Sequence, residues 1–288
     1  MSAPGVVPGG ENVSMRSRPV SRALSALAAS LLTAALAGCG GSEPAAQPPA
    51  SGSPSASADA GDENARAELA ARAALAVDYR FAALYTLDVV GEAQRSVMAT
   101  VANDGSWRVD IPGGALGGTA DVAIAQTEAG LFQCAIPSAT NPLITPACVR
   151  VADKGERVPK KYDPKIQRLF RQWLPVFTDR QSALSVNAAQ PLPGSTGDCY
   201  SVDSNTASLS AAVDIGIYCY SPEGLLTAAR VNFGTITIAG TPAAPPSTIE
   251  LPGPVSGGDP LGLASPPPPP VQPSLIPSMN APLPSPSA

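Results

Sequence analysis

The stretch that decides the fold is YTLDVV at residues 85–90, followed by VMATVANDGSWRVDI at residues 97–111. Apolar and polar residues alternate in both pieces, which is the two-residue period of a β-strand with one buried face. Asn103-Asp104-Gly105 interrupts the second piece with a strong turn signal. The stretch therefore predicts a meander of at least three antiparallel strands.

Further strand-like runs follow this meander along the chain. One pair of runs closes around Glu128-Ala129-Gly130, and another closes around Ser221-Pro222-Glu223-Gly224. We expect a bulge at Gly234, because an isolated glycine inside a strand pattern often marks one. The runs cover residues 122–125, 131–136, 199–202, 215–220 and 225–238.

Two helices are predicted beside these strands. Residues 63–77 are rich in alanine, the strongest helix former, and residues 163–177 repeat apolar side chains at helical spacing. Pro164 fits the first position of the second helix, and Pro175 is expected to end or kink it. Its apolar stripe comprises Ile166, Leu169, Phe170, Trp173, Leu174 and Phe177. The sequence thus predicts an α+β domain: a curved antiparallel sheet of about six to eight strands packed on an N-terminal helix and an inserted amphipathic helix.

Composition divides the chain around this domain. Residues 39–63 are dominated by Gly, Ser, Ala and Pro and indicate a flexible linker. Residues 64–241 form the predicted globular domain. Residues 242–288 hold sixteen of the 33 prolines and carry no charge after Asp259, so we interpret them as a Pro-rich disordered tail.

The first 38 residues have the features of a signal peptide. Arg16, Arg18 and Arg22 precede an uncharged, apolar run at residues 23–37. About fifteen residues are too few to span a bilayer, which takes roughly 20. We interpret Met15 as the translation start, because the residues before it add nothing to the signal.

The motif Leu36-Ala37-Gly38-Cys39 ends this signal and resembles the lipobox of bacterial lipoproteins. In that family the cysteine sulfur receives a diacylglycerol, the chain is cut before the cysteine, and the new amino group is often acylated. The resemblance implies that Cys39 tethers the chain to the extracytoplasmic face of the cell membrane. The alternative is a buried cysteine after an amphipathic helix.

The four remaining cysteines form two local pairs by spacing. We predict disulfides Cys134–Cys148 and Cys199–Cys219, which an oxidising exterior would favour. Four cysteines permit three connectivities, and buried free thiols are a further alternative.

The residue inventory argues against an enzyme. The chain has no histidine, which removes Ser-His-Asp and Cys-His catalysis and histidine metal sites. It also has no Ser-x-x-Lys motif and no Gly-rich phosphate loop. A glycosidase-type pair among Asp88, Asp110 and Asp121 is disfavoured, since acids on the polar side of a strand are usually solvated. We therefore predict no catalytic residue, no metal and no cofactor.

Basic residues gather in one segment of an acidic chain. Residues 150–180, the basic segment, hold nine basic and four acidic residues, a net charge of +5 against −5 for the protein. A basic amphipathic helix can lie on an anionic lipid surface. This interpretation assigns a membrane-surface contact to Lys160, Lys161, Lys165, Arg168 and Arg171. In the alternative, the apolar stripe packs into the core and the charges are solvated. Overall acidity disfavours nucleic acid as a partner.

The element order, the lipobox and YCYSPEGLLTAARV at residues 218–231 are similar to those of periplasmic lipoprotein carriers and mycobacterial lipid-transfer lipoproteins. In that family a strongly bent antiparallel sheet wraps helices around an apolar cavity for acyl chains. The resemblance implies that the domain binds or carries an anionic lipid or another hydrophobic ligand. The alternative function is a cell-envelope module that binds a protein or glycan and no small molecule.

Overall fold

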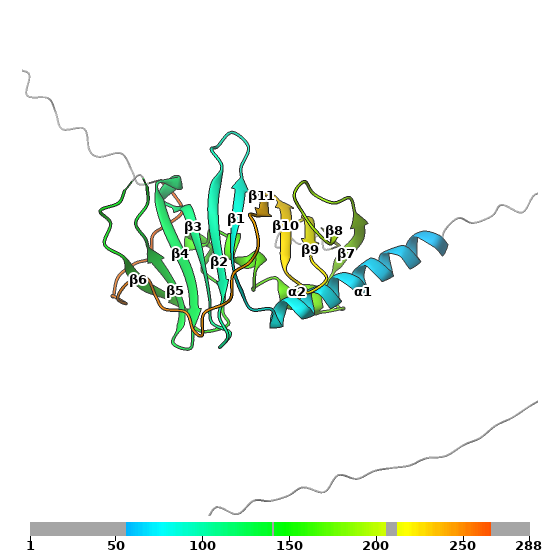
Figure 1. The fold of residues 1–288 in the computed structure, drawn as a ribbon, viewed down its shortest axis with the longest axis horizontal. Coiled ribbons are helices and arrows are strands. Elements are labelled where there is room, and N and C mark those ends of the chain that lie inside the picture. Colours follow the sequence, from blue (N-terminus) through cyan, green and yellow to red (C-terminus); the bar gives the residue numbers. More distant parts are fainter. Residues whose placement is uncertain (1–55, 140, 206–211, 266–288) are drawn as a thin grey trace, which may run out of the picture. The chain divides into compact units, whose positions relative to one another are not determined.

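The computed structural model describes residues 56–139, 141–205 and 212–265, with side chains from residue 63 (Figure 1). These residues form one open, antiparallel, eleven-stranded sheet with two α-helices and three short 3-10 helices. The strands are β1 Phe81–Asp88, β2 Arg95–Val101, β3 Trp107–Ala115, β4 Ala120–Thr127, β5 Gly130–Ala135, β6 Ala147–Ala152, β7 Leu184–Ala189, β8 Asp198–Ser204, β9 Gly216–Tyr220, β10 Leu226–Val231 and β11 Gly234–Ile238. The helices are α1 Ala56–Asp78, η1 Leu116–Gly118, η2 Lys160–Tyr162, η3 Ile166–Leu169 and α2 Leu174–Thr178.

The sheet consists of two meanders joined at its centre. Its order is β6-β5-β4-β3-β2-β1-β11-β10-β9-β8-β7, so the first and last strands pair with each other (Figure 1). Every neighbouring pair in the list is antiparallel. The β1–β2 turn, the β10–β11 turn and the chain entering β9 consequently lie at one end of the sheet, which we call the mouth end.

The alternation that predicted the first meander is confirmed. Along β1 the burial pattern repeats every second residue, with Tyr85 and Leu87 buried. The turn between β2 and β3 has Gly105 at φ +85°, a conformation that glycine adopts without steric cost. The backbone N–H of Gly105 donates to the Ala102 carbonyl at 3.0 Å. We call the face with these buried side chains the inner face.

The prediction of six to eight strands is too low. Edge strands β6 and β7 are short and alternate poorly, so no clear period marks them in the sequence. The run at 225–238 is a hairpin rather than one strand with a bulge, because Asn232 and Phe233 turn the chain between β10 and β11. Gly234, at φ +138°, begins β11. Because the turn has only two residues, the alternation of apolar and polar side chains continues from β10 into β11, and the two strands look like one in the sequence.

The predicted continuous helix at 163–177 is also wrong. Lys165 has φ +68°, which breaks the helical path before η3, and Pro175 lies in the first turn of α2 instead of ending a helix. A proline is tolerated in a first turn because its missing N–H has no partner there.

The apolar side chains of this segment nevertheless all enter the core. The ring centroid of Phe170 lies 5.0 Å from that of Tyr85, and the rings of Trp173 and Phe177 both meet Tyr218 edge-on. The stripe therefore packs against the inner face, as the alternative interpretation of the basic segment predicted. An amphipathic helix lying on a membrane is excluded for these side chains.

Helix α1 begins within the predicted linker, at Ala56, and packs against β7 and α2 (Figure 1). Leu69 and Ala73 are fully buried on the face that meets the core. Arg66 anchors the helix, because its guanidinium donates to the Asp179 carbonyl at 2.7 Å and to Ser182 Oγ at 2.8 Å. The helix thus packs into the main core next to β7.

Residues 242–265, which we call the C-terminal strap, cross the outer face of the sheet at Ile249, run beside edge strand β6 at Val255 and reach the inner core at Leu261 (orange in Figure 1). Asn103 N–H donates to the Pro246 carbonyl and Cys148 N–H to the Pro254 carbonyl, both at 2.9 Å. The strap side chain Ile249 packs in a cluster with the outer-face side chains of Ala102 and Ala125.

The interpretation of residues 242–288 as a disordered tail is therefore wrong for residues 242–265. Proline-rich chain suits a strap that lies on apolar side chains, because proline has no N–H group that would need a partner. The folded domain extends beyond the predicted boundary at residue 241. Residues 266–288 lie outside the described part of the chain.

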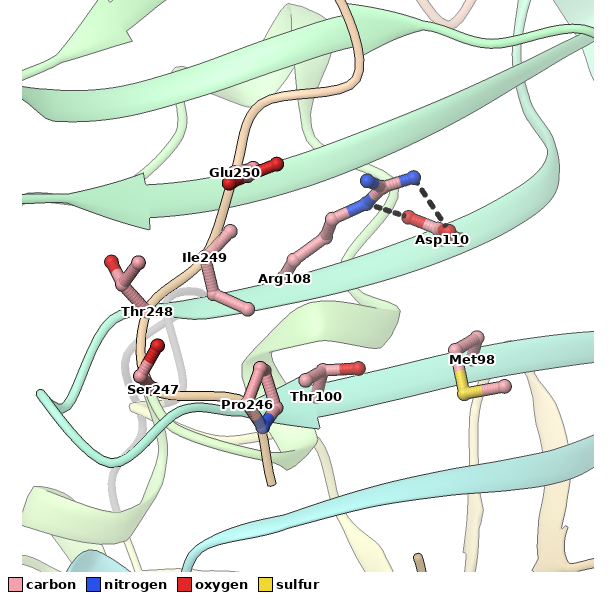
Figure 2. A pocket seen from close by; sticks show the side chains of 9 residues that line it. All are labelled: Met98, Thr100, Arg108, Asp110, Pro246, Ser247, Thr248, Ile249 and Glu250. Atoms are coloured by element: carbon pink, nitrogen blue, oxygen red, sulfur yellow. Dashed lines mark hydrogen bonds and ion pairs between the residues drawn. The ribbon is translucent and has the colours of Figure 1, made fainter. Parts of the chain in front are cut away.

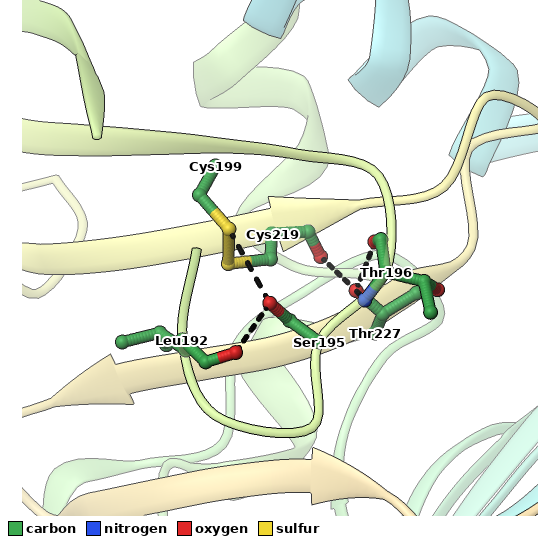
Figure 3. Close-up of a disulfide and its surroundings, with 6 residues drawn as sticks. All are labelled: Leu192, Ser195, Thr196, Cys199, Cys219 and Thr227. Atoms are coloured by element: carbon green, nitrogen blue, oxygen red, sulfur yellow. Dashed lines mark hydrogen bonds between the residues drawn. A yellow bond between two sulfur atoms is a disulfide. The ribbon is translucent and has the colours of Figure 1, made fainter. Parts of the chain in front are cut away.

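Both predicted disulfides are present. Cys134 and Cys148 are direct partners across β5 and β6, and Cys199 and Cys219 are direct partners across β8 and β9. Both lie in the small apolar clusters of the outer face. Beside the second disulfide, Ser195 Oγ donates to the Leu192 carbonyl at 2.6 Å and closes a turn over the sulfur atoms (Figure 3).

Replacing Cys199 and Cys219 together with serine is expected to lower the free energy of unfolding by about 3 kcal/mol, because the crosslink closes a loop with a separation of 20 residues. Urea denaturation of the oxidised double variant measures this loss. Reduced wild-type protein serves as a control and should lose at least as much, since both crosslinks open. An unchanged midpoint in the double variant would show that the bond does not form in solution.

Candidate ligand pocket

Residues 157–168, which we call the basic loop, cross the mouth end of the sheet. The strap holds this loop, because Leu263 N–H donates to the Lys161 carbonyl at 3.0 Å. Strand β5 holds it as well, because Gln133 Nε2 donates to the Tyr162 carbonyl at 3.3 Å and to the Leu261 carbonyl at 3.0 Å. Two distant parts of the chain therefore fix the position of the loop.

The carboxylate of Asp163 organises the basic loop. Its side chain is only 1% exposed. One oxygen accepts from Lys165 N–H at 2.9 Å and from Gln167 Nε2 at 2.7 Å, and the other forms an ion pair with Arg168 Nη2. A buried charge is tolerated only when it is paired and hydrogen-bonded in this way. These bonds hold Lys165 in its left-handed conformation, which is uncommon for a residue with a side chain.

A pocket of about 840 Å³ opens beside the basic loop, and we call it the mouth pocket. Its walls come from the basic loop, from the chain before β9, from the β10–β11 turn and from the strap. Its charged lining residues are the cations Arg157, Lys160, Lys165 and Arg168 and the acids Asp163 and Asp214. Its uncharged lining residues are Val158, Pro159, Val213, Ile215, Asn232 and Leu263.

A second pocket of about 480 Å³ lies next to the mouth pocket, and we call it the side pocket. The two share four lining residues, namely Asp163, Lys165, Asn232 and Leu263. The other walls of the side pocket are mostly apolar and come from Leu87, Ile111, Gly113, Gly114, Pro164, Ile166 and Phe233, together with the charged Arg95. A charged chamber therefore adjoins a more apolar one.

The cations of the mouth pocket differ in their partners. Arg168 pairs with Asp163, and Lys165 Nζ lies 3.8 Å from Asp214 Oδ2. In the described part of the chain, the side chains of Arg157 and Lys160 have neither an ion pair nor a hydrogen bond, and both are exposed. The pocket therefore presents two cations whose charge nothing else on its walls neutralises.

Two buried polar atoms of residues that line this pocket make no hydrogen bond among the described residues, although one of them, Asp214 Oδ2, lies 3.8 Å from Lys165 Nζ. The other atom is Arg168 Nε. Both atoms have almost no accessible surface, so a ligand in the mouth pocket would meet other atoms of these two side chains.

Three of the five cations assigned to a membrane contact, Lys160, Lys165 and Arg168, line the mouth pocket. Lys161 is exposed with its Nζ 4.4 Å from the Tyr162 ring centroid, and a hydrogen bond to Tyr162 raises its pKa. Arg171 lies elsewhere, where its Nη1 donates to the Val77 carbonyl at the end of α1 at 2.7 Å. Burial lowers the pKa of Arg171, and the nearby charge of Arg80 lowers it further.

Sequence reasoning missed several residues of the pocket. Arg157 could have been predicted from the sequence, because it belongs to the basic segment. Asp214, Asn232 and Leu263 had no local signal, since they join the basic loop only through the sheet and the strap.

The three acids considered for catalysis make separate contacts. Asp110 forms a two-point ion pair with Arg108, at 2.5 and 2.8 Å. Asp88 accepts from Gln94 Nε2 at 2.9 Å, and Asp121 accepts from Gly113 N–H at 2.8 Å.

A further pocket of about 440 Å³ lies between the strap and the outer faces of β2 and β3 (Figure 2). Strap residues 246–250 form one wall, and Met98, Thr100, Arg108 and Asp110 form the other. Figure 2 shows that its cation and its nearest acid bind each other. Because its one cation is paired and its other charged residue is the acid Glu250, this pocket offers no free cation, and the mouth pocket is the stronger candidate.

The predicted anchor lies outside the described residues, including the cleavage motif Leu36, Ala37 and Gly38 and the lipidation site Cys39. Within the described ranges, no helix is long and apolar enough to cross a membrane.

Comparisons with known proteins give little guidance. No family model matches the chain, and no curated protein matches it. A solved structure described as "Crystal structure of MucB" is similar over 71% of this chain with a TM-score of 0.39 and 11% sequence identity. The match covers 66% of the MucB chain. Function is therefore inferred from the residues and geometry of this chain.

Proposed function

We propose that the protein is a lipoprotein tethered through Cys39 to the extracytoplasmic face of the membrane, and that it binds a lipid or another hydrophobic ligand without catalysing a reaction. The observation that carries the proposal is the mouth pocket of about 840 Å³, which shares four lining residues with a more apolar side pocket. Pockets for small ligands typically measure 300–1,000 Å³, so the volume suits a single acyl-bearing molecule.

The lining of the two pockets suits an amphiphile. Leu87, Ile111 and Phe233 offer apolar walls in the side pocket, whereas Arg157 and Lys160 bring positive charge to the mouth pocket. A ligand with an apolar chain and an anionic group would match both chambers at once. We also propose that this sheet corresponds to the curved half-barrel of the lipid carriers, with its inner face toward the ligand.

The mouth end suits contact with a membrane. Val90 in the β1–β2 turn is fully exposed, and Ile215 before β9 is 55% exposed. Exposed apolar residues and free cations at the same end of the sheet favour an anionic lipid surface, where each basic residue contributes about 1 kcal/mol. A lipid on Cys39 would hold the domain near that surface, so even a weak contact would be populated.

Mass spectrometry of organic extracts tests the binding function. The full chain is purified from its own membrane, denatured, and extracted. We expect one class of lipid in near-equal amount to the protein, because a ligand held in two adjoining pockets should survive purification. A lipid-free preparation that also takes up no acyl ligand when lipids are added would overturn the proposal and would favour the cell-envelope interaction module.

Substituting Cys39 with serine is expected to move the protein from the membrane fraction to the soluble fraction. Two or three acyl chains suffice for stable anchoring, since each buried methylene group contributes about 0.8 kcal/mol. Cell fractionation and metabolic labelling with palmitate measure the change. The matched control is Cys199→Ser, which removes a cysteine and should keep the label. Retention of label by Cys39→Ser would show that the lipid lies elsewhere.

A further inference from the structure

The mouth pocket has a charge pattern that a purely apolar ligand does not need. Its walls carry four cations and two acids, a net charge of +2 in a protein whose overall charge is −5. Desolvating charges is costly, so a site for hydrocarbon alone would be expected to exclude them. The concentration of cations at this pocket therefore indicates an anionic group on the ligand.

The acids are already occupied by other cations. Asp163 is fully used by its ion pair with Arg168 and its bonds to Lys165 N–H and Gln167. Asp214 lies near Lys165 Nζ. The positive charge that remains belongs to Arg157 and Lys160, which both line the pocket and lie within a stretch of four residues.

The kinds of cation present point to an oxyanion with several acceptor atoms. An arginine presents a planar fork of donors that matches phosphate or carboxylate, and a lysine adds a point charge. Two free cations balance a phosphate better than a carboxylate, because a phosphate monoester carries up to two negative charges.

We propose that the mouth pocket binds the phosphate group of its ligand through Arg157 and Lys160, supported by Lys165 and Arg168, while the side pocket takes an apolar chain. This assignment rests on the proposed lipid-binding function and names the ligand class as phosphate-bearing amphiphiles. Arg157 and Lys160 provide the selectivity. Lys165 and Arg168 are also tied to Asp163 and Asp214 and keep the loop in place.

The test compares two ligands that differ only in the phosphate. Dihexanoyl phosphatidic acid and dihexanoylglycerol are short enough to be studied without vesicles, and glycerol 3-phosphate supplies the same head group without chains. Isothermal titration calorimetry uses the full chain carrying Cys39→Ser. We expect phosphatidic acid to bind at least about tenfold more tightly than dihexanoylglycerol, the effect of one charge-assisted contact.

The matched variants separate pocket charge from general charge. Arg157→Gln with Lys160→Gln should reduce the preference for phosphatidic acid about tenfold. Lys154→Gln with Arg180→Gln removes the same charge from exposed positions of the basic segment and should leave the preference unchanged. Circular dichroism should show equal folding, because all four side chains are exposed.

The outcomes distinguish this inference from the proposed function. Equal binding of both lipids, unaffected by Arg157→Gln with Lys160→Gln, would overturn the phosphate assignment and leave lipid binding intact. Binding of neither lipid would overturn both. Glycerol 3-phosphate binding as tightly as phosphatidic acid would support the phosphate site but overturn its assignment to a lipid.

Discussion

A chain that ends at residue 241 is expected to be less stable than the full chain by about 3–5 kcal/mol and to aggregate, whereas a chain that ends at residue 265 should match it. The shorter chain loses the strap, which buries Ile249 on the outer face and supplies carbonyl partners to Asn103 and Cys148. Burying an isoleucine contributes about 1.5–3 kcal/mol, and each hydrogen bond adds about 1 kcal/mol. The loss approaches the whole stability of a marginal domain.

Urea denaturation of the two truncated chains measures this effect, with the chain ending at 265 as the internal control. The two designs differ only in residues 242–265. Equal midpoints would mean that the strap contributes nothing and that its contacts are not formed in solution. A low midpoint for both chains would place the stabilising residues after 265 and contradict a domain boundary at residue 265.

Replacing Asp163 with alanine is expected to cost about 3–5 kcal/mol of stability and to disrupt the basic loop. The substitution leaves the guanidinium of Arg168, whose side chain is 16% exposed, without its ion pair, and an unpaired buried charge is strongly destabilising. It also removes the acceptor for Lys165 N–H and Gln167. Phosphatidic acid binding should fall as well, because the loop carries the cations of the mouth pocket.

The matched control is Asp153→Ala in the same basic segment. Asp153 also pairs with an arginine, Arg150, but its side chain is 70% exposed, and exposed ion pairs contribute about 0–1 kcal/mol. Both variants are compared by urea denaturation. If Asp163→Ala cost no more than Asp153→Ala, the buried pair with Arg168 would be refuted, and the organisation of the loop with it.

Sequence alone predicted the features that depend on neighbours along the chain. The alternation in β1 to β3 and the turn at Asn103-Asp104-Gly105 are local signals, and they are confirmed. The disulfide pairs also followed from spacing, because each joins strands that are adjacent in the sheet. A period of two is a reliable sign where one face is buried and the other is solvated.

The features that sequence reasoning missed depend on distant contacts. Nothing near residues 242–265 shows that Ile249 would meet Ala102 and Ala125 on the outer face, so proline content alone suggested disorder. The break at Lys165 comes from the buried carboxylate of Asp163, which competes with helix formation. The composition of the basic segment predicted three cations of the mouth pocket as contact residues. Asp214, which lies near Lys165 Nζ, is distant in sequence and was not predicted.

The central claim is that a phosphate-bearing lipid occupies the mouth and side pockets. The most direct measurement is photo-crosslinking of the full chain with phosphatidic acid that carries a diazirine on one acyl chain, followed by peptide mapping. We expect the label to fall on the side-pocket walls, at Leu87, Ile111, Ile166 or Phe233, and to disappear with excess unlabelled phosphatidic acid. Label confined to the strap pocket near Met98, or spread over the surface and insensitive to competition, would contradict the claim.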